Sequence, residues 1–382
     1  MTYSSYRVTV PGKLVIAGEY AVLENQQAVV AAIDRYMTAT IEPNEINVLS
    51  LPLLGLGQVS WDISGKTVLF SLPDPRLRFI KNAITIAYQY LQEQSVSIKP
   101  CHLTVKSGLA DRLTGRKYGL GSSAAVVVAV ISAILRFHCE REEEAPSLDQ
   151  IFKLSAMAHL QAQKNGSGVD IAASTYGGWL VYTPFNQNWL RNELLHGTKL
   201  SQLIEKPWPN LSIIPIKAPL QLTFCVGWTK EAASTAPMIN QFKAFRNRNR
   251  EAYSLFLKES SQAVAGLIQS FEENDCAAAI SSLTENRKVL KQLGKAAAIS
   301  IETTRLMDLC DTAESFGSGK SSGAGGGDCG IAFLKGEAQM EELNKAWRSI
   351  GVQPIDMRIS EMGAYVTEYD CEPSLKEYFV CV

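Results

Sequence analysis

The segment that most constrains this chain is a glycine turn that leads into a long apolar stretch. It reads Lys117-Tyr118-Gly119-Leu120-Gly121-Ser122-Ser123-Ala124-Ala125, and an apolar run from Val126 to Leu135 follows. The pattern predicts a buried helix over 122–137 that begins directly after the glycines. Glycine lets a ligand approach the backbone, and the first N–H groups of a helix lie unpaired at its positive end. We therefore expect the turn to bind an anion, namely a nucleotide phosphate; a plain capped helix is the alternative.

The composition is that of a folded protein with a sizeable core. The chain has 382 residues, of which 46% are hydrophobic and 20% charged. Such a chain is not expected to be disordered, and its length suits two or three domains. The net charge is −1, from 37 basic and 38 acidic residues. Nucleic-acid binders usually carry a basic excess, so we expect no nucleic-acid partner.

The N-terminus and the cysteines indicate a cytoplasmic protein. Residues Met1 to Tyr6 contain no charged stretch followed by an apolar one, so no signal peptide is predicted. The longest apolar run, Ala124 to Leu135, is too short to cross a bilayer, and no membrane partner is expected. The eight cysteines form no C-x-x-C pair and the four histidines are widely separated. We therefore expect buried thiols, with neither a disulfide framework nor a zinc site.

Periodicity and turn residues predict an α+β protein. Strands are expected at 6–16, 28–41, 96–105, 176–182, 211–216, 220–228 and 329–334, and two more close the chain. Helices are expected at 72–91, 122–137, 147–164 and 337–350, with a helix-rich stretch up to Phe316 and a glycine-serine loop at 317–327. The helix at 147–164 opens on Ser147-Leu148-Asp149-Gln150, which has the pattern of a capping box. The polar, proline-bearing segment 191–210 is the best boundary, so we predict two domains, 1–205 and 206–382, with the site between them.

Three further motifs could carry chemistry. Lys13 follows Pro11-Gly12 in the first predicted strand, although a lone lysine is usually solvated surface. Asp170 follows the turn Gly166-Ser167-Gly168, where an acidic residue is more often a helix cap than a catalyst. The run from Gly323 to Gly330, which includes Asp328 and is preceded by Lys320-Ser321-Ser322, is rich in glycine and could be a flexible linker. The strand predicted directly after it favours a fixed loop.

In this order, the four motifs resemble those of the GHMP kinase superfamily of small-molecule kinases. The resemblance extends from Pro11 to Gly330, and its two glycine motifs, 118–123 and 323–327, are specific as a pair. It implies the two-domain fold of the superfamily with the active site between the domains, and ATP and Mg²⁺ as cofactors. The residues expected to bind the nucleotide are Lys117, Gly119, Leu120, Gly121, Ser122, Ser123 and Ala124.

Within the superfamily, the stretches 12–24, 170–179 and 227–235 are most similar to members whose acceptor is 5-phosphomevalonate. The resemblance implies conversion of this acceptor to its diphosphate in the mevalonate pathway of isoprenoid biosynthesis. A GHMP kinase acting on mevalonate or another hydroxyl acceptor is the main alternative; a nucleotide-binding regulator and a purely structural protein are two others. The sequence is compatible with a monomer or a homodimer. The residues expected to bind the acceptor are Ser167, Ser234, Thr235, Ser322, Gly323, Ala324 and Gly325.

A phosphate acceptor changes what the catalytic residues must do. Its second pKa is about 6, so little proton removal is needed at neutral pH. Two polyanions must instead be brought together, which requires cations. Lys13 is expected at the reacting centre and Lys117 on the loop, with Lys320 and Lys230 as weaker candidates. We predict that Lys13 stabilises the transferring charge and that Asp170 positions Lys13 and the acceptor; proton abstraction by Asp170 is the alternative.

The expected metal site departs from the pattern of the superfamily. Several members carry a Glu about eleven residues before the aspartate, where it helps to hold Mg²⁺, and this chain has His159 there. Because Mg²⁺ prefers hard oxygen ligands, we expect the Ser123 hydroxyl and the nucleotide phosphates to hold the ion.

A last segment reads as a helix start close to the acceptor. Ser234-Thr235-Ala236-Pro237 combines hydroxyl caps with a proline in the first turn, and its amino end could bind the anionic group of the acceptor. Plain capping is equally compatible with these residues. The cations that follow at helical spacing, Lys243, Arg246 and Arg250, are expected to form a solvated surface.

Overall fold

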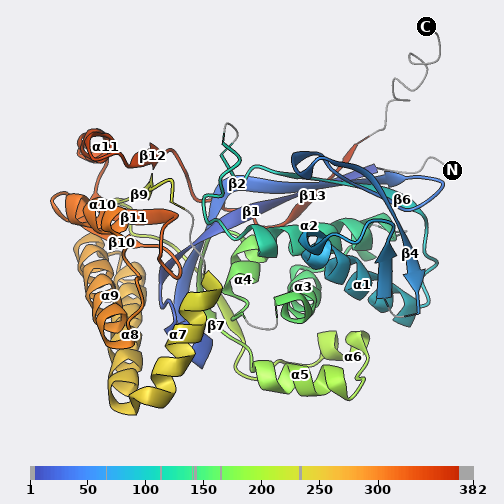
Figure 1. Cartoon of the computed structure of the whole chain (residues 1–382), viewed down its shortest axis with the longest axis horizontal. Coiled ribbons are helices and arrows are strands. Elements are labelled where there is room, and N and C mark those ends of the chain that lie inside the picture. The colour runs from blue at the N-terminus through green and yellow to red at the C-terminus, as the bar shows by residue number, and fades with distance from the viewer. Residues whose placement is uncertain are drawn as a thin grey trace, which may run out of the picture.

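The computed structural model describes residues 5–65, 67–111, 114–139, 141, 144–163, 166–231 and 235–369. They form two parts that lie side by side along the longest axis of the molecule (Figure 1). One part is built on a nine-stranded sheet and the other on a four-stranded sheet. Both parts contain helices as well as strands, so the predicted α+β class is confirmed.

The first sheet runs in the order β13-β1-β2-β6-β3-β4-β5, and β7 extends it by pairing with both β2 and β8. Among the described residues, the strand pairs of this sheet are antiparallel except β3 with β6. The central strands are rich in valine, isoleucine and alanine and are buried along most of their length. Its strands are β1 (Ser5–Ala17), β2 (Ala28–Pro43), β3 (Val48–Leu51), β4 (Leu56–Ser64), β5 (Thr67–Phe70), β6 (Cys101–Ser107), β7 (Trp179–Thr183), β8 (Ser212–Ile216) and β13 (Tyr365–Tyr369).

Helices cover one face of this sheet, the lower face in Figure 1. Helix α2 packs against β1 and β2 and is apolar on nearly all sides, which is what a helix buried between a sheet and other helices requires. The covering helices are α1 (Arg78–Glu93), α2 (Ser122–Phe137), α3 (Leu148–Gln163) and α4 (Val169–Tyr176), with α5 (Gln187–Leu195) and α6 (Leu200–Glu205) further out.

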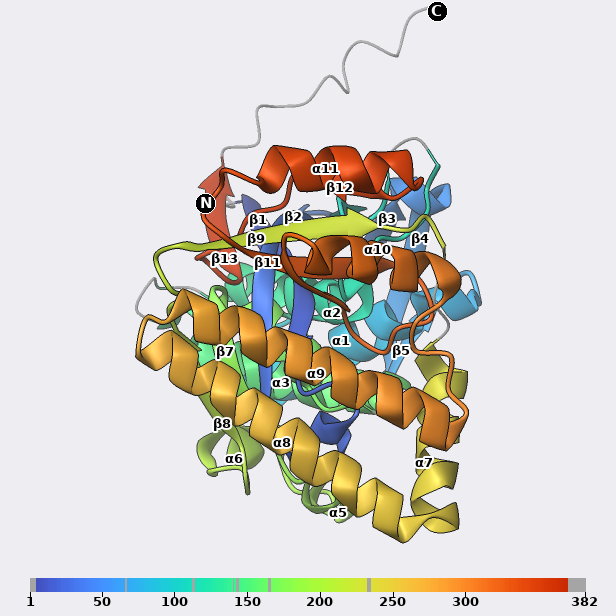
Figure 2. The same ribbon diagram turned by 90° about the vertical axis from the view of Figure 1, so that its left-hand side faces the viewer.

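The second sheet has the order β10-β11-β9-β12 and carries helices on both faces. Its strands are β9 (Leu222–Trp228), β10 (Gly317–Ser321), β11 (Cys329–Lys335) and β12 (Gln353–Ile355), and its helices are α7 (Thr235–Arg248), α8 (Arg250–Glu272), α9 (Cys276–Ala297), α10 (Thr304–Glu314) and α11 (Met340–Ser349). Figure 2 shows the long helices α8 and α9 running side by side across this end of the molecule. Val226 and Ile331 pack with α8 and α9, and the alternate residues Cys225 and Ala332 pack with α10 and α11.

Several predicted elements have the expected bounds. Helix α2 covers Ser122–Phe137 as predicted, and α3 opens on the predicted capping box, in which Gln150 N donates to Ser147 Oγ and Ser147 N donates to Gln150 Oε1. The strand expected at 96–105 is shifted to Cys101–Ser107, and Tyr176 belongs to α4 instead of a strand. The short strands β3 to β5 and helices α5 and α6 were not predicted, since their apolar pattern is weak.

The glycine-serine loop predicted at 317–327 is wrong in its first half. Residues 317–321 form strand β10, which pairs with β11. A Cβ atom at Gly319 would lie 2.6 Å from Cβ of Ala313, so glycine is what lets the strand pass directly under α10. In the sequence alone these small residues predict a loop. In the structure they make room for α10 to pack on strand β10.

The domain division at 205/206 stays a prediction. Strands β8 and β13 follow this point in the chain but pair with β7 and β1, which precede it. The first sheet is therefore closed by residues from both sides of the predicted boundary. Among the described helices, none combines the length and the apolar character needed to cross a membrane.

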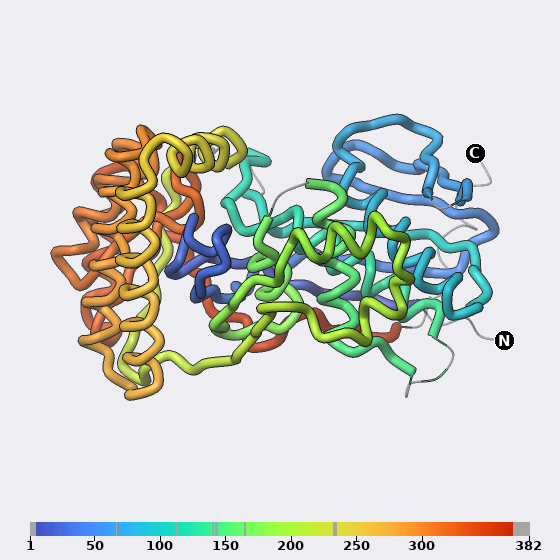
Figure 3. Tube along the Cα trace, turned by 90° about the horizontal axis from the view of Figure 1, so that it is seen from below, coloured from blue at the N-terminus to red at the C-terminus, as the bar shows by residue number. Residues whose placement is uncertain are grey.

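The turn between β1 and β2 connects the two parts. Tyr20 and Ala21 lie in one apolar cluster with residues of α7, α8 and α9, including Phe242 and Phe256. The rings of Tyr20 and Phe242 are 5.2 Å apart, within the range of a favourable aromatic pair. Figure 3 shows this blue turn inserted beside the C-terminal helices.

A buried histidine holds the end of α2. His138 is 3% exposed; its Nδ1 donates to the Ile134 carbonyl at 2.8 Å and its Nε2 accepts from the Lys99 backbone N–H at 3.0 Å. A second proton on the ring would break the bond to Lys99. Burial lowers the pKa of His138, and the bond that the ring donates to the Ile134 carbonyl partly opposes the shift.

We expect the stability of the protein to fall below about pH 6.5, where the unfolded chain takes up a proton that folded His138 does not. The loss from one such group is at most about 1.4 kcal/mol per pH unit. Urea unfolding at pH values from about 5 to about 8 should give a shallower pH slope for His138→Gln than for the wild type. Some slope should remain, because burial also lowers the pKa of His159.

His196→Gln is the control, since His196 is an exposed residue at the end of α5. It should keep the wild-type slope. Equal slopes for the wild type and His138→Gln would contradict the role given to His138.

Candidate active site

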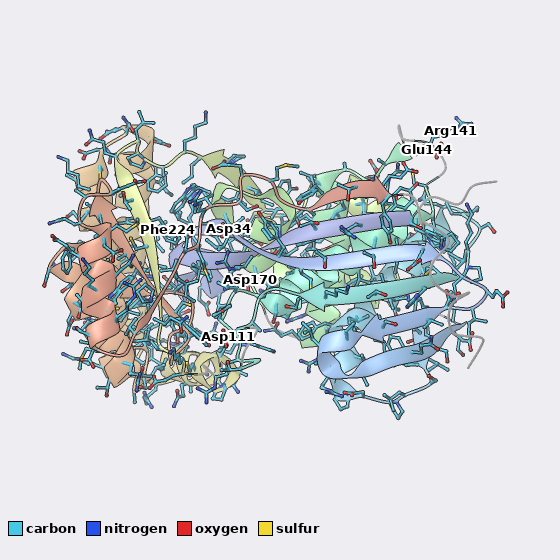
Figure 4. The ribbon with its side chains drawn as sticks, turned by 90° about the horizontal axis from the view of Figure 1, so that it is seen from above. Asp34, Asp111, Arg141, Glu144, Asp170 and Phe224 are labelled. Atoms are coloured by element: carbon cyan, nitrogen blue, oxygen red, sulfur yellow. The ribbon has the colours of Figure 1, made fainter. Side chains whose placement is uncertain are left out.

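A cavity lies where the two parts meet. Its lining comes from β1, the β1–β2 turn, the start of α4, the start of α7 and the glycine-rich loop before β11. Figure 4 shows Asp170 near the middle of the molecule, between the second sheet and the first. The predicted site residues that line the cavity are Lys13, Gly119, Ser167, Asp170, Thr235, Ser322, Gly323, Ala324 and Gly325.

Lys13 and Asp170 form an ion pair in this cavity, with Lys13 Nζ 3.4 Å from Asp170 Oδ1. Lys13 projects from β1 and is 7% exposed. Asp170 lies in the first turn of α4, which is fixed to β1 because Ser174 Oγ donates to the Pro11 carbonyl at 2.9 Å. An ammonium group held by one carboxylate keeps further N–H donors, so Lys13 can also bind a phosphate.

The amino end of α2 is packed against this pair. The Lys13 backbone N–H donates to the Leu120 carbonyl at 3.0 Å, which fixes the glycine turn to β1. Gly121 has a φ of 74°, and a Cβ atom there would lie 2.9 Å from Lys13 Cε and 3.4 Å from Asp170 Oδ2. No side chain caps the helix at Gly121. The positive end of α2 therefore lies directly beside Lys13 and Asp170.

Not every residue of the predicted nucleotide segment is free to bind. The Ala124 N–H donates to the Gly121 carbonyl at 3.0 Å, and the side chains of Leu120 and Ala124 are buried. Lys117 is exposed, and its backbone bridges to Ala110. The nucleotide contacts given to this segment stay predictions.

Ser123, the predicted metal ligand, contacts His159. His159 Nε2 lies 3.3 Å from Ser123 Oγ, and the imidazole stacks on Phe79. Burial lowers the pKa of His159, while Asp170 acts in the opposite direction, so the ring is neutral at pH 7. In the described residues, no cluster of three acidic, histidine or cysteine side chains could hold a metal ion by itself. One hydroxyl oxygen would leave nucleotide phosphates as the main ligands of a Mg²⁺ ion.

The glycine-rich loop after β10 is fixed at several points. Ser322 Oγ donates to the Val15 carbonyl at 2.9 Å, and Tyr20 Oη donates to the Ala324 carbonyl at 2.6 Å. The Gly326 N–H donates to the Ile301 carbonyl at 2.8 Å. The loop is thus held against β1 and the β1–β2 turn, and the interpretation as a fixed loop is the one that agrees with these bonds.

Lys320 does not face the cavity, although it was a weaker candidate for a substrate-binding cation. It is fully buried and forms an ion pair with Glu19 Oε1, and it also donates to the Ser321 carbonyl at 2.7 Å. A buried lysine must be paired, and here the partner comes from the β1–β2 turn. Its function is to connect the two parts of the molecule. Lys230 lies on a turn with a φ of 64°, outside the cavity lining among the described residues.

Two acidic residues of the site were missed. Glu19 lines the cavity, and its Oε2 is buried without a hydrogen-bond partner among the described residues. Asp328 also lines the cavity and packs on Gly119, whose Cβ would lie 2.7 Å from the Asp328 Cβ. Both residues belong to motifs that were singled out because of other residues. The sequence therefore placed Glu19 and Asp328 near the site, but it did not indicate that their side chains line the cavity. Ser234 lies outside the described residues.

The fold and this site agree with a known family of kinases. The family model for the GHMP kinases N terminal domain matches residues 79–178, and the model for the GHMP kinases C terminal domain matches residues 267–353. The chain belongs to the GHMP kinases, and it is a kinase. The phosphomevalonate kinase of Streptomyces sp. (strain CL190) is 33% identical over 362 residues, which cover 91% of this chain and 95% of that protein.

Two solved structures resemble this one over almost its full length. A Lin0012 protein from Listeria innocua has a TM-score of 0.88 and 38% identity, covering 96% of this chain and 99% of that one. Streptococcus pneumoniae phosphomevalonate kinase in complex with phosphomevalonate and AMPPNP has a TM-score of 0.79 and 28% identity, covering 92% of this chain and 99% of that one.

We expect Gly121→Ala to lose most of its kinase activity, because the new methyl group would displace Lys13 from Asp170. A displacement of about 1 Å can lower a rate by about 10²-fold. The left-handed φ should also cost about 1–2 kcal/mol of stability. Steady-state kinase assays and denaturant unfolding measure the two effects separately.

Gly115→Ala is a matched control. Gly115 also has a positive φ, of 69°, but a Cβ atom there would have no neighbour within 4 Å. Its variant should lose similar stability and retain activity. If Gly121→Ala and Gly115→Ala lose activity equally, the close packing of Gly121 against Lys13 is not what activity requires.

Proposed function

We propose that this enzyme transfers the terminal phosphoryl group of ATP to 5-phosphomevalonate, giving 5-diphosphomevalonate and ADP in the mevalonate pathway. The observation that carries the proposal is the Lys13–Asp170 pair at the amino end of α2, in one cavity with the glycine-rich loop. The likeness to phosphomevalonate kinases over nearly the whole chain supports the choice of acceptor.

In this proposal the triphosphate lies along the glycine turn 119–123, with its terminal group facing Lys13. Another hollow, lined by Lys106, Gly108, Asp111 and Tyr118 among others, adjoins the segment that leads into the turn. Tyr118 directly precedes Gly119, so a nucleoside in this hollow would lead its phosphates onto the turn. The glycine turn then separates the nucleoside from the reacting centre.

The acceptor phosphate attacks the terminal phosphorus as the bond to the bridging oxygen of ATP breaks and ADP leaves. Since the acceptor is mostly ionised at pH 7, the enzyme must bring two anions together more than remove a proton. Lys13 neutralises charge on the transferring group, and the amino end of α2 adds a positive field. Asp170 holds Lys13 in position.

The remaining residues surround the acceptor or the metal. Ser167, Thr235 and the loop from Ser322 to Gly325 line the cavity on the side of Asp170 and α7 and are proposed to bind the acceptor, with Ser234 beside them in sequence. Mg²⁺ bound with ATP would neutralise phosphate charge, and Ser123 is the residue proposed to contact it.

The proposal is tested by the acceptor requirement of ADP release. The purified protein is assayed with ATP and Mg²⁺, and with 5-phosphomevalonate, mevalonate or no acceptor. We expect ADP release that depends on 5-phosphomevalonate, together with formation of the diphosphate. Faster turnover of mevalonate than of 5-phosphomevalonate would show that the enzyme is a kinase with a hydroxyl acceptor instead. Equal ADP release in all three assays would exclude transfer to either acceptor.

Asp170→Asn should lower kcat by roughly 10²-fold, because Lys13 loses its positioning partner. If Asp170 acts by position, the fold-loss should be the same at pH 7 and at pH 9. A loss that shrinks as pH rises would indicate proton abstraction instead. Asp149→Asn is the control: Asp149 pairs with Lys153 at 2.9 Å on α3, outside the cavity lining, and its variant should keep the wild-type kcat.

A further inference from the structure

A further hollow, different from the one at Lys106 and Tyr118, lies next to the catalytic cavity along helix α7. The two share Leu23, Gly166 and Ile239 in their linings, so they lie next to each other. The hollow is also lined by Arg191 of α5, and by Lys243 and Arg246 of α7. We call this hollow the basic recess.

Helix α7 lines both spaces with one face. Thr235 lines the catalytic cavity, Ile239 lines both, and Lys243 lines the basic recess. These residues are four apart, so they lie above one another on the helix at about 6 Å per step. The cations at 243 and 246, which the sequence places on a solvated face, therefore line the hollow next to the catalytic cavity.

The two spaces differ in charge. Among the described residues that line the catalytic cavity, Glu19, Asp170 and Asp328 lie with Lys13, and Glu19 is paired with Lys320. Among the described residues of the basic recess, Glu24 is the acidic one and lies 3.4 Å from Arg246, while Arg191 and Lys243 are further cations. Arg191 Nη2 is oriented by a 3.5 Å contact with Gln187 Oε1 on the preceding turn of α5. The recess is thus a further space, beside the catalytic cavity, that suits an anion.

We propose that the basic recess binds the carboxylate end of the acceptor, with Lys243 and Arg191 as the residues that recognise it. The inference rests on the proposed function. The acceptor has an anionic group at each end, and its phosphate must lie at Lys13 to react. Its carboxylate then points away from the reacting centre, and the recess is the adjoining space that offers cations. Charge-assisted bonds from lysine or arginine are the usual means of carboxylate recognition.

The test compares two acceptors. One is 5-phosphomevalonate; the other is 3-hydroxy-3-methylpentyl phosphate, in which a methyl group replaces the carboxylate. The ratio of kcat/KM for the two acceptors measures recognition of the carboxylate. We expect Lys243→Met and Arg191→Met each to lower this ratio about 10-fold or more, through a higher KM for 5-phosphomevalonate. The KM for ATP should not change.

Lys258→Met is the control, because Lys258 is an exposed lysine on the neighbouring helix α8 and lines neither space among the described residues. It should keep the wild-type ratio. If the wild type phosphorylates 5-phosphomevalonate but both variants keep its ratio, or lose both acceptors equally, the recess does not bind the carboxylate. If the wild type does not phosphorylate 5-phosphomevalonate at all, the proposed function itself is overturned, and this inference with it.

Discussion

The chemistry of this kinase depends on how the first turn of α2 packs against β1. The Leu120 carbonyl accepts the Lys13 backbone N–H, and Gly121 has no side chain to keep the turn away from Lys13. The same strand therefore carries Lys13 and fixes the positive helix end beside it. In the proposed reaction two polyanions meet here, so a small shift between strand and helix would weaken both sources of positive charge together.

The cavity exists because the two parts are fixed to each other at the β1–β2 turn. Glu19 and Lys320 pair in the interior, and Tyr20 binds the Ala324 carbonyl while packing on Phe242. Removing one partner of such a buried pair leaves an uncompensated charge, which typically costs about 3–5 kcal/mol. The glycine-rich loop and α7 are held at the same turn, so the side of the cavity proposed to bind the acceptor is built around residues 19 and 20.

Much of the fold and the motif positions could be predicted from the sequence, but not the surroundings of particular side chains. The bounds of α2 and the capping box of α3 follow from local spacing. Strand β10 was missed because Gly317 and Gly319 are typical of a loop until α10 lies on them. Lys320 was a weaker candidate for a cation at the reacting centre, since nothing near it in sequence shows that Glu19 reaches it.

The sequence by itself determined the glycine turn, the helix that it opens and the presence of a lysine and an aspartate suited to phosphoryl transfer. These features are local, because backbone conformation and helical periodicity depend on neighbouring residues. The tertiary structure is what brings the charged side chains together. Lys13 pairs with Asp170 and Lys320 pairs with Glu19, while Arg191 and Lys243 line the same recess. The reason is that the partners lie far apart in the chain, and a charged group acquires its burial and its neighbours only when distant segments pack together.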